Sequence, residues 1–128
     1  MRALFLAIFL AALAFTLVMA WLPHPPAVPW QEHDKVWHMV AFVTLSFLAS
    51  LAFPAAPLLR IGERLSFLGA LIEVGQSIPA LHRDCDIRDW IADTIAVAVT
   101  LLLVAAIRRL RAGEGHRKPI ASVGDSEP

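Results

Sequence analysis

The sequence predicts an all-α integral membrane protein, a bundle of four transmembrane helices. Of its 128 residues, 58% are hydrophobic and 17% are charged, whereas an ordinary soluble domain has about 45–50% apolar and about 25% charged residues. Four apolar runs recur along the chain. None of them alternates like the strands of about 9–11 residues that build membrane barrels. Helices remain as the spanning structure, because lipid cannot satisfy open backbone groups.

The first predicted span covers residues 3–22, which carry no charge. A helix of this length reaches about 30 Å, the thickness of a hydrocarbon core. Arg2 and the segment Val18-Met19-Ala20 also fit a cleaved signal peptide, but apolar cores of signal peptides are about 7–15 residues long. We therefore expect a retained helix. Residues 23–30 contain four prolines and predict a stiff connector.

Three further runs complete the predicted bundle. Residues 36–53 form the second, which Pro54 and Pro57 close. Residues 65–78 form the third and contain Glu73 and Gln76. Residues 90–107 form the fourth, with Asp93 as the sole charge. We expect one helical domain over residues 1–110 and a disordered cytoplasmic tail over residues 111–128, which are rich in Gly, Ser and charged residues.

The basic residues predict the orientation of the four spans. With four spans, both termini and the middle loop share one side. Eight of the 11 Lys and Arg residues fall on that side, and three on the other: Lys35, Arg83 and Arg88. The positive-inside rule therefore predicts cytoplasmic termini. All four tryptophans, Trp21, Trp30, Trp37 and Trp90, fall at the predicted outer boundary, where we expect them to anchor the helices.

Polar residues converge on the predicted outer side. Glu73 and Gln76 are three residues apart and share a helix face, and Asp89 and Asp93 are four apart and share another. The predicted topology brings them together with His38 and the loop before the fourth span. We expect an outward-facing cleft whose binding residues are Lys35, His38, Glu73, Gln76, Arg83, Asp89 and Asp93.

Each of these residues also has a structural interpretation. A charge such as Glu73 costs about 2.5–3.5 kcal/mol in the membrane, so it needs a partner or a function. A bond to Arg83, His38 or a neighbouring backbone group would supply the partner. Asp86 can cap the fourth helix, with Asp89 closing a capping box. In a catalytic interpretation, Glu73, Asp89 and His38 are the acid and base candidates, and the sequence leaves open whether the protein is an enzyme.

Several classes of function find no support. The 11 basic and 11 acidic residues cancel, so nothing indicates a nucleic-acid partner. Neither H-x-x-x-H nor H-E-x-x-H occurs, and there is a single cysteine, so we expect no metal site. We also expect no cofactor, because neither a P-loop nor a dinucleotide-binding fingerprint occurs. Cys85 is expected to be an incidental loop thiol.

Residues 34–103 contain a combined pattern that resembles the VanZ-like family of small bacterial membrane proteins. The pattern consists of Asp34-Lys35-Val36-Trp37-His38 with Phe42, then Glu73-Val74-Gly75-Gln76, then Pro79, Arg83, Asp89 and Asp93. Asp93 stands where the family has asparagine, and Ala96 where it has glycine. The resemblance implies a multi-pass protein of the bacterial cytoplasmic membrane that acts at the cell envelope. It also implies a link to resistance against teicoplanin, a glycopeptide antibiotic.

Three functions follow as expectations. The first is the non-enzymatic binding of an extracytoplasmic amphiphile, such as a glycopeptide, a lipid-linked wall precursor or a lipid headgroup. The second is an intramembrane acid/base enzyme that acts on an envelope lipid. The third is a small proton-coupled carrier, which with four short spans would require a homo-oligomer.

Overall fold

The computed structural model describes residues 1–22, 34–81 and 85–115 and contains four α-helices and no strand in these residues. The helices are α1 (Arg2–Trp21), α2 (Asp34–Ala52), α3 (Leu58–Gln76) and α4 (Ile87–Gly115), and a short 3₁₀ helix, η2 (Pro79–Leu81), follows α3. The all-α prediction is therefore confirmed for the described residues.

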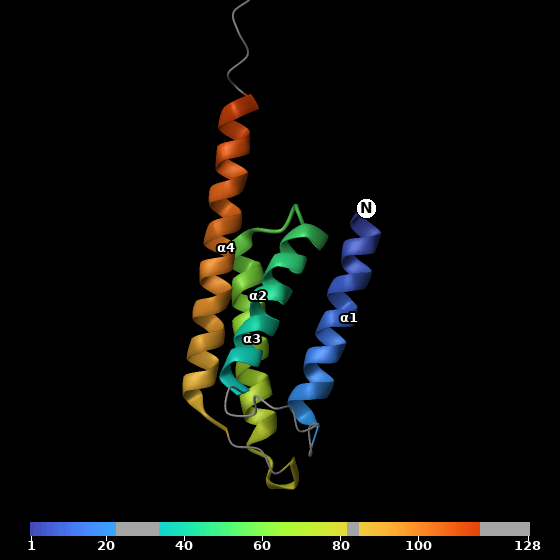
Figure 1. Cartoon of the computed structure of the whole chain (residues 1–128), viewed down its shortest axis with the longest axis vertical. Coiled ribbons are helices and arrows are strands. Elements are labelled where there is room, and N and C mark those ends of the chain that lie inside the picture. The colour runs from blue at the N-terminus through green and yellow to red at the C-terminus, as the bar shows by residue number, and fades with distance from the viewer. Residues whose placement is uncertain (23–33, 82–84, 116–128) are drawn as a thin grey trace, which may run out of the picture.

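The four helices run up and down in an antiparallel bundle (Figure 1). The start of α1, the connection between α2 and α3, and the end of α4 lie at one end. The other end is formed by the last turns of α1 and α3 and the first turns of α2 and α4. We call it the polar end, because Glu73, Gln76, Asp86 and Asp93 lie there. The alternation therefore places the start of α1 and the end of α4 at the same end of the bundle, as the predicted topology requires.

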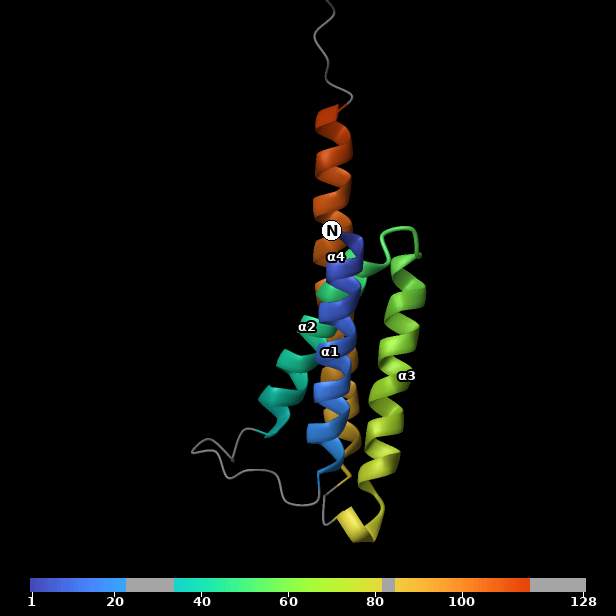
Figure 2. The ribbon, with the colours of Figure 1, turned by 90° about the vertical axis from the view of Figure 1, so that its right-hand side faces the viewer.

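The helices form a ring rather than a row. Helix α2 packs against α1 and α4, and α3 packs mainly against α4. Turning the molecule shows α1 in front of α4, with α2 and α3 on opposite sides of this pair (Figure 2). The core lies between the helices and centres on the fully buried side chains of Phe42, Leu45 and Ile72.

Two helix boundaries differ from the predicted ones by more than three residues. Helix α3 begins at Leu58, seven residues before the predicted start, because Pro57 precedes its first turn and the charged residues Arg60, Glu63 and Arg64 lie on the exposed surface of its first two turns. Helix α4 continues to Gly115, five residues into the segment expected to be a disordered tail, and projects beyond the bundle (Figure 1). The rest of that tail lies outside the described residues.

Two helices, residues Arg2–Trp21 and Ile87–Gly113, are long and apolar enough to cross a membrane, and Val36–Ala52 is a shorter apolar helix. Helix α3 carries the four charged residues Arg60, Glu63, Arg64 and Glu73 and is not among them. A membrane association is therefore supported by length and hydropathy for two of the four predicted spans.

Candidate functional site

The last turn of α3 supplies the two polar side chains that the sequence placed on one helix face. Glu73 is 6% exposed and Gln76 is 3% exposed, so both point into the bundle at its polar end. The spacing of three residues therefore predicted their shared face correctly. What it could not predict is that the two side chains have different partners.

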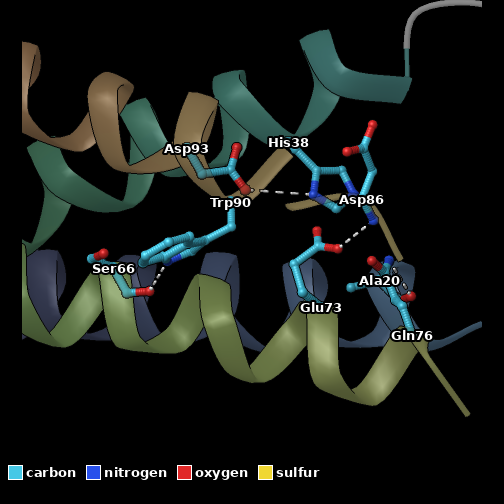
Figure 3. Close-up of polar contacts among 8 residues, drawn as sticks. All are labelled: Ala20, His38, Ser66, Glu73, Gln76, Asp86, Trp90 and Asp93. Carbon is cyan, nitrogen blue, oxygen red and sulfur yellow. Dashed lines mark hydrogen bonds and ion pairs between the residues drawn. The ribbon is translucent and has the colours of Figure 1, made fainter. Parts of the chain in front are cut away.

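Glu73 joins the end of α3 to the start of α4. Its Oε2 accepts a hydrogen bond of 3.0 Å from the backbone N–H of Asp86 (Figure 3). This N–H belongs to the residue before the first turn of α4, and such groups have no partner within their own helix. The structural interpretation of Glu73, a bond to a neighbouring backbone group, thus holds for one of its two carboxylate oxygens.

Asp86 caps α4, as its position in the sequence predicts. Its Oδ1 accepts a hydrogen bond of 2.9 Å from the backbone N–H of Arg88, the second residue of the helix. Its carbonyl oxygen accepts one of 2.8 Å from the N–H of Asp89. Since Glu73 accepts from the N–H of Asp86 itself, an acid from the preceding helix occupies the role that a capping box gives to the third helical residue.

Gln76 connects α3 to α1 by a hydrogen bond. Its side-chain amide donates a 3.0 Å hydrogen bond to the carbonyl oxygen of Ala20, in the last turn of α1 (Figure 3). Carbonyls in the last turn of a helix lack an intrahelical donor, so Gln76 serves as a cap. At the same junction, the indole of Trp21 lies against Gly75, where an added Cβ would overlap the ring. The sequence predicts that Gln76 lines a binding cleft, but it does not predict that Gln76 caps α1.

His38 and Asp93 face each other between α2 and α4. The distance between His38 Nδ1 and Asp93 Oδ2 is 3.6 Å, and the Asp93 residue is 2% exposed (Figure 3). Electrostatic interactions also connect Asp93 with Asp89, and Glu73 with both His38 and Asp89. Four of the titratable side chains expected to share a site, His38, Glu73, Asp89 and Asp93, therefore lie together at the polar end.

The buried carboxylate oxygens of this cluster include Glu73 Oε1 and Asp93 Oδ1, which have no hydrogen-bond partner within the described part of the chain. A buried carboxylate oxygen without a donor costs free energy, on the order of 1–3 kcal/mol or more for a charged group. These two atoms are the acceptors that the cluster can offer to a ligand that supplies N–H or O–H groups.

A second polar contact, which the sequence did not reveal, links α3 and α4 deeper in the bundle. The indole N–H of Trp90 donates a 3.0 Å hydrogen bond to the carbonyl oxygen of Ser66 (Figure 3). The hydroxyls of Ser66 and Thr94 lie 2.8 Å apart. The ring of Trp90 also packs against Gly69, since a side chain there would meet the indole at 3.3 Å. The anchoring of Trp90 at the membrane interface stays a prediction.

The structure describes the remaining predicted site residues only in part. Arg83 lies outside the described residues, as does Trp30. Lys35 belongs to the first turn of α2, and its side chain also lies outside them. Among the side chains that are described, no group of three His, Cys, Asp or Glu residues is arranged to hold a metal ion.

Cys85 is exposed at the same end, directly before the cap of α4. Desolvation and the nearby Glu73 carboxylate raise the pKa of its thiol above the usual value. A raised pKa leaves less thiolate at neutral pH, which makes this cysteine a weak nucleophile.

Comparisons with family models, with curated proteins and with solved structures find no match for this chain. The resemblance to the VanZ-like family stays a prediction.

Proposed function

We propose that the protein is a VanZ-like protein of the bacterial cytoplasmic membrane that binds the polar headgroup of an extracytoplasmic amphiphile at its polar end. The amphiphile would be a glycopeptide such as teicoplanin, a lipid-linked wall precursor or a membrane lipid. One observation carries the proposal. Glu73 Oε1 and Asp93 Oδ1 are buried acceptors without a donor among the described residues, and they come from two neighbouring helices at one end of the bundle.

The distribution of side chains supports a position within the membrane. Large apolar residues lie on the outside of all four helices, among them Phe15, Phe47, Phe67, Leu102 and Leu103, each at least half exposed. Polar side chains are buried instead, including Ser46, Ser50, Glu73, Gln76 and Asp93. Water-soluble monomers rarely expose contiguous apolar surface on this scale. Lipid acyl chains are the solvent that suits such an exterior.

The charge distribution supports an outward-facing polar end. The end of the bundle opposite to it carries Arg2, Arg60, Arg64, Arg108, Arg109 and Arg111. The positive-inside rule assigns that end to the cytoplasm. A helix of 29 residues is about 43 Å long, so α4 exceeds a hydrocarbon core of about 30 Å and carries its last arginines beyond it.

One contact favours a second candidate function, an acid/base enzyme acting on an envelope lipid. His38 and Asp93 form an imidazole–carboxylate pair at 3.6 Å, and Glu73 lies near enough to interact with His38. Such a pair can hold an imidazole in position for proton transfer. In this function Glu73, Asp89 and His38 are the catalytic candidates. A proton-coupled carrier that works as a homo-oligomer is a further candidate with the same groups.

The proposal is tested by measuring teicoplanin bound to spheroplasts that express the wild type or a variant at matched membrane levels. The informative variants are Glu73→Gln and Asp93→Asn, which remove a charge and keep the size. Glu63→Gln is the matched control, since Glu63 is an exposed acid on the same helix, far from the polar end. We expect the wild type and the control to change the amount of bound drug, and both polar-end variants to lose that change.

Two results would contradict the proposal. If bound drug changes with the wild type and remains changed in both polar-end variants, the buried carboxylates are not the binding groups. If turnover of an envelope lipid accompanies expression and disappears in Glu73→Gln while binding remains, the second candidate function, an acid/base enzyme, is the correct one.

A further inference from the structure

We propose that the headgroup bound at the polar end carries a primary ammonium group, as an aminophospholipid does. This inference rests on the proposed function and specifies its ligand. It follows from the charge of the cluster, from the kind of hydrogen-bonding atoms that it presents, and from the apolar surface beside it.

The described side chains of the cluster are predominantly acidic. Glu73, Asp89 and Asp93 contribute three carboxyl groups, and His38 is the basic side chain that the described residues place among them. A protonated His38 can neutralise one carboxylate. Buried negative charge without a counter-ion is costly, so a ligand that enters with positive charge is stabilised and an anionic one is repelled.

The two carboxylate oxygens without a partner determine which hydrogen-bond donors the ligand must supply, in addition to its charge. Glu73 Oε1 projects from α3, and Asp93 Oδ1 belongs to α4. Both atoms are acceptors, and each belongs to a residue that is at least nine-tenths buried. A primary ammonium group has three N–H donors that can serve acceptors on different helices. A quaternary ammonium group has the same charge but no N–H, so it would leave both oxygens unsatisfied.

The surroundings fit a headgroup attached to acyl chains. Glu73 lies one turn before the end of α3, and Val74 and Ile78 beside it are more than half exposed. An acyl chain can lie along these side chains while its headgroup reaches the buried oxygens. Asp86 and Asp89 are only half-buried, so the cluster lies just inside the end of the bundle.

The test uses the purified full-length chain in detergent and measures bound lipid by native mass spectrometry. The lipids share their acyl chains and form a series: phosphatidylethanolamine, its mono- and dimethyl derivatives, and phosphatidylcholine. The positive charge is constant along the series while the N–H donors decrease from three to none. Phosphatidylglycerol provides an anionic headgroup, and free ethanolamine tests whether the amine is recognised without acyl chains.

We expect binding to decrease along the methylation series by at least about tenfold overall, because each lost N–H removes a hydrogen bond between charged groups and leaves a buried acceptor unsatisfied. Glu73→Gln and Asp93→Asn should abolish this preference. Glu63→Gln should retain it, and circular dichroism should show unchanged helix content in all three variants. Competition by free ethanolamine would assign the recognition to the amine alone, and its absence would assign it to the amine together with the lipid.

Three results would overturn the inference. They are equal binding of phosphatidylethanolamine and phosphatidylcholine by the wild type, tighter binding of phosphatidylglycerol, or a preference that both polar-end variants retain. The first two leave the proposed function intact, because a headgroup of another kind is then bound. If the wild type binds none of these lipids and spheroplasts also show no change in bound teicoplanin, the proposed function fails as well.

Discussion

Glu73 connects the end of α3 to the start of α4 through one carboxylate oxygen, while its other oxygen is buried without a hydrogen-bond partner in the described part of the chain. Its position three residues before Gln76 predicts a shared helix face, and the structure confirms it. Its partner, the N–H of Asp86, is 13 residues away along the chain. A hydrogen bond between two consecutive helices depends on how the helices pack against each other. The periodicity of residues within either helix does not determine that packing. The same reason explains why the contact from Gln76 to Ala20 and the contact from Trp90 to Ser66 were not predicted.

Replacing Glu73 separates its role as an acceptor from its charge. Glutamine keeps a carbonyl oxygen for the N–H of Asp86, whereas alanine leaves that N–H without its acceptor. We expect Glu73→Ala to be less stable than Glu73→Gln by about 1–3 kcal/mol, the cost of an unsatisfied buried group. Thermal unfolding in detergent measures the difference, with Glu63→Ala and Glu63→Gln as the exposed control pair. Equal stability of the two Glu73 variants would show that the bond to Asp86 contributes nothing.

The thiol of Cys85 reports the charge of Glu73 independently. Desolvation and the Glu73 carboxylate raise the pKa of the thiol, and only the thiolate reacts with maleimides. Removing the carboxylate in Glu73→Gln should lower this pKa, so the pH–rate profile of labelling should move to lower pH with an unchanged plateau at high pH. Glu63→Gln should leave the profile in place. A profile that does not move in Glu73→Gln would mean that the carboxylate is uncharged or distant.

At the scale of the helices, apolar runs predicted the existence and order of all four elements but not their ends. Charged residues were interpreted as loop at the start of α3 and the end of α4. In both places they lie on the exposed surface of a continuing helix. Arg108 even has a structural role, because its guanidinium donates a 2.7 Å hydrogen bond to the carbonyl oxygen of Ser50, in the last turn of α2. A hydropathy pattern cannot distinguish such a cap from a solvated charge.

This contact predicts different effects for two neighbouring arginines. Arg108→Ala removes a cationic donor from the negative end of the α2 dipole and leaves a terminal carbonyl without its partner. We expect a loss of about 1 kcal/mol in the free energy of unfolding, a value at the lower end for a partly exposed charged group. Arg109→Ala, at an exposed position of the same helix, should have no effect. Equal effects in denaturant titrations would argue against the cap.

At the scale of the whole molecule, the apolar composition predicted a helical bundle in a membrane, and length and hydropathy support a membrane association for two of its four helices. The core combines apolar residues such as Phe42 with buried Ser46 and Ser50, and the outside carries large apolar side chains on every helix. The ring arrangement of the helices was not predictable, because the sequence orders the helices but does not say which of their faces meet. The antiparallel order of the helices brings His38 of α2, Glu73 of α3 and Asp93 of α4 to one end, as the sequence predicts, and the ring arrangement turns the helices so that these side chains face one another.

The proposed binding site requires that the polar end lie on the outer side of the membrane. Cys85, the one cysteine of the sequence, marks that end, and Gly113 marks the opposite end at a position where an added Cβ meets nothing within 4 Å. Labelling of spheroplasts with a membrane-impermeant maleimide compares the wild type with the double variant Cys85→Ser, Gly113→Cys. We predict that Cys85 reacts in sealed spheroplasts and that the thiol at position 113 reacts only after lysis. The reverse pattern, or reaction of both in sealed spheroplasts, would contradict the proposed four-span topology and its outward-facing site.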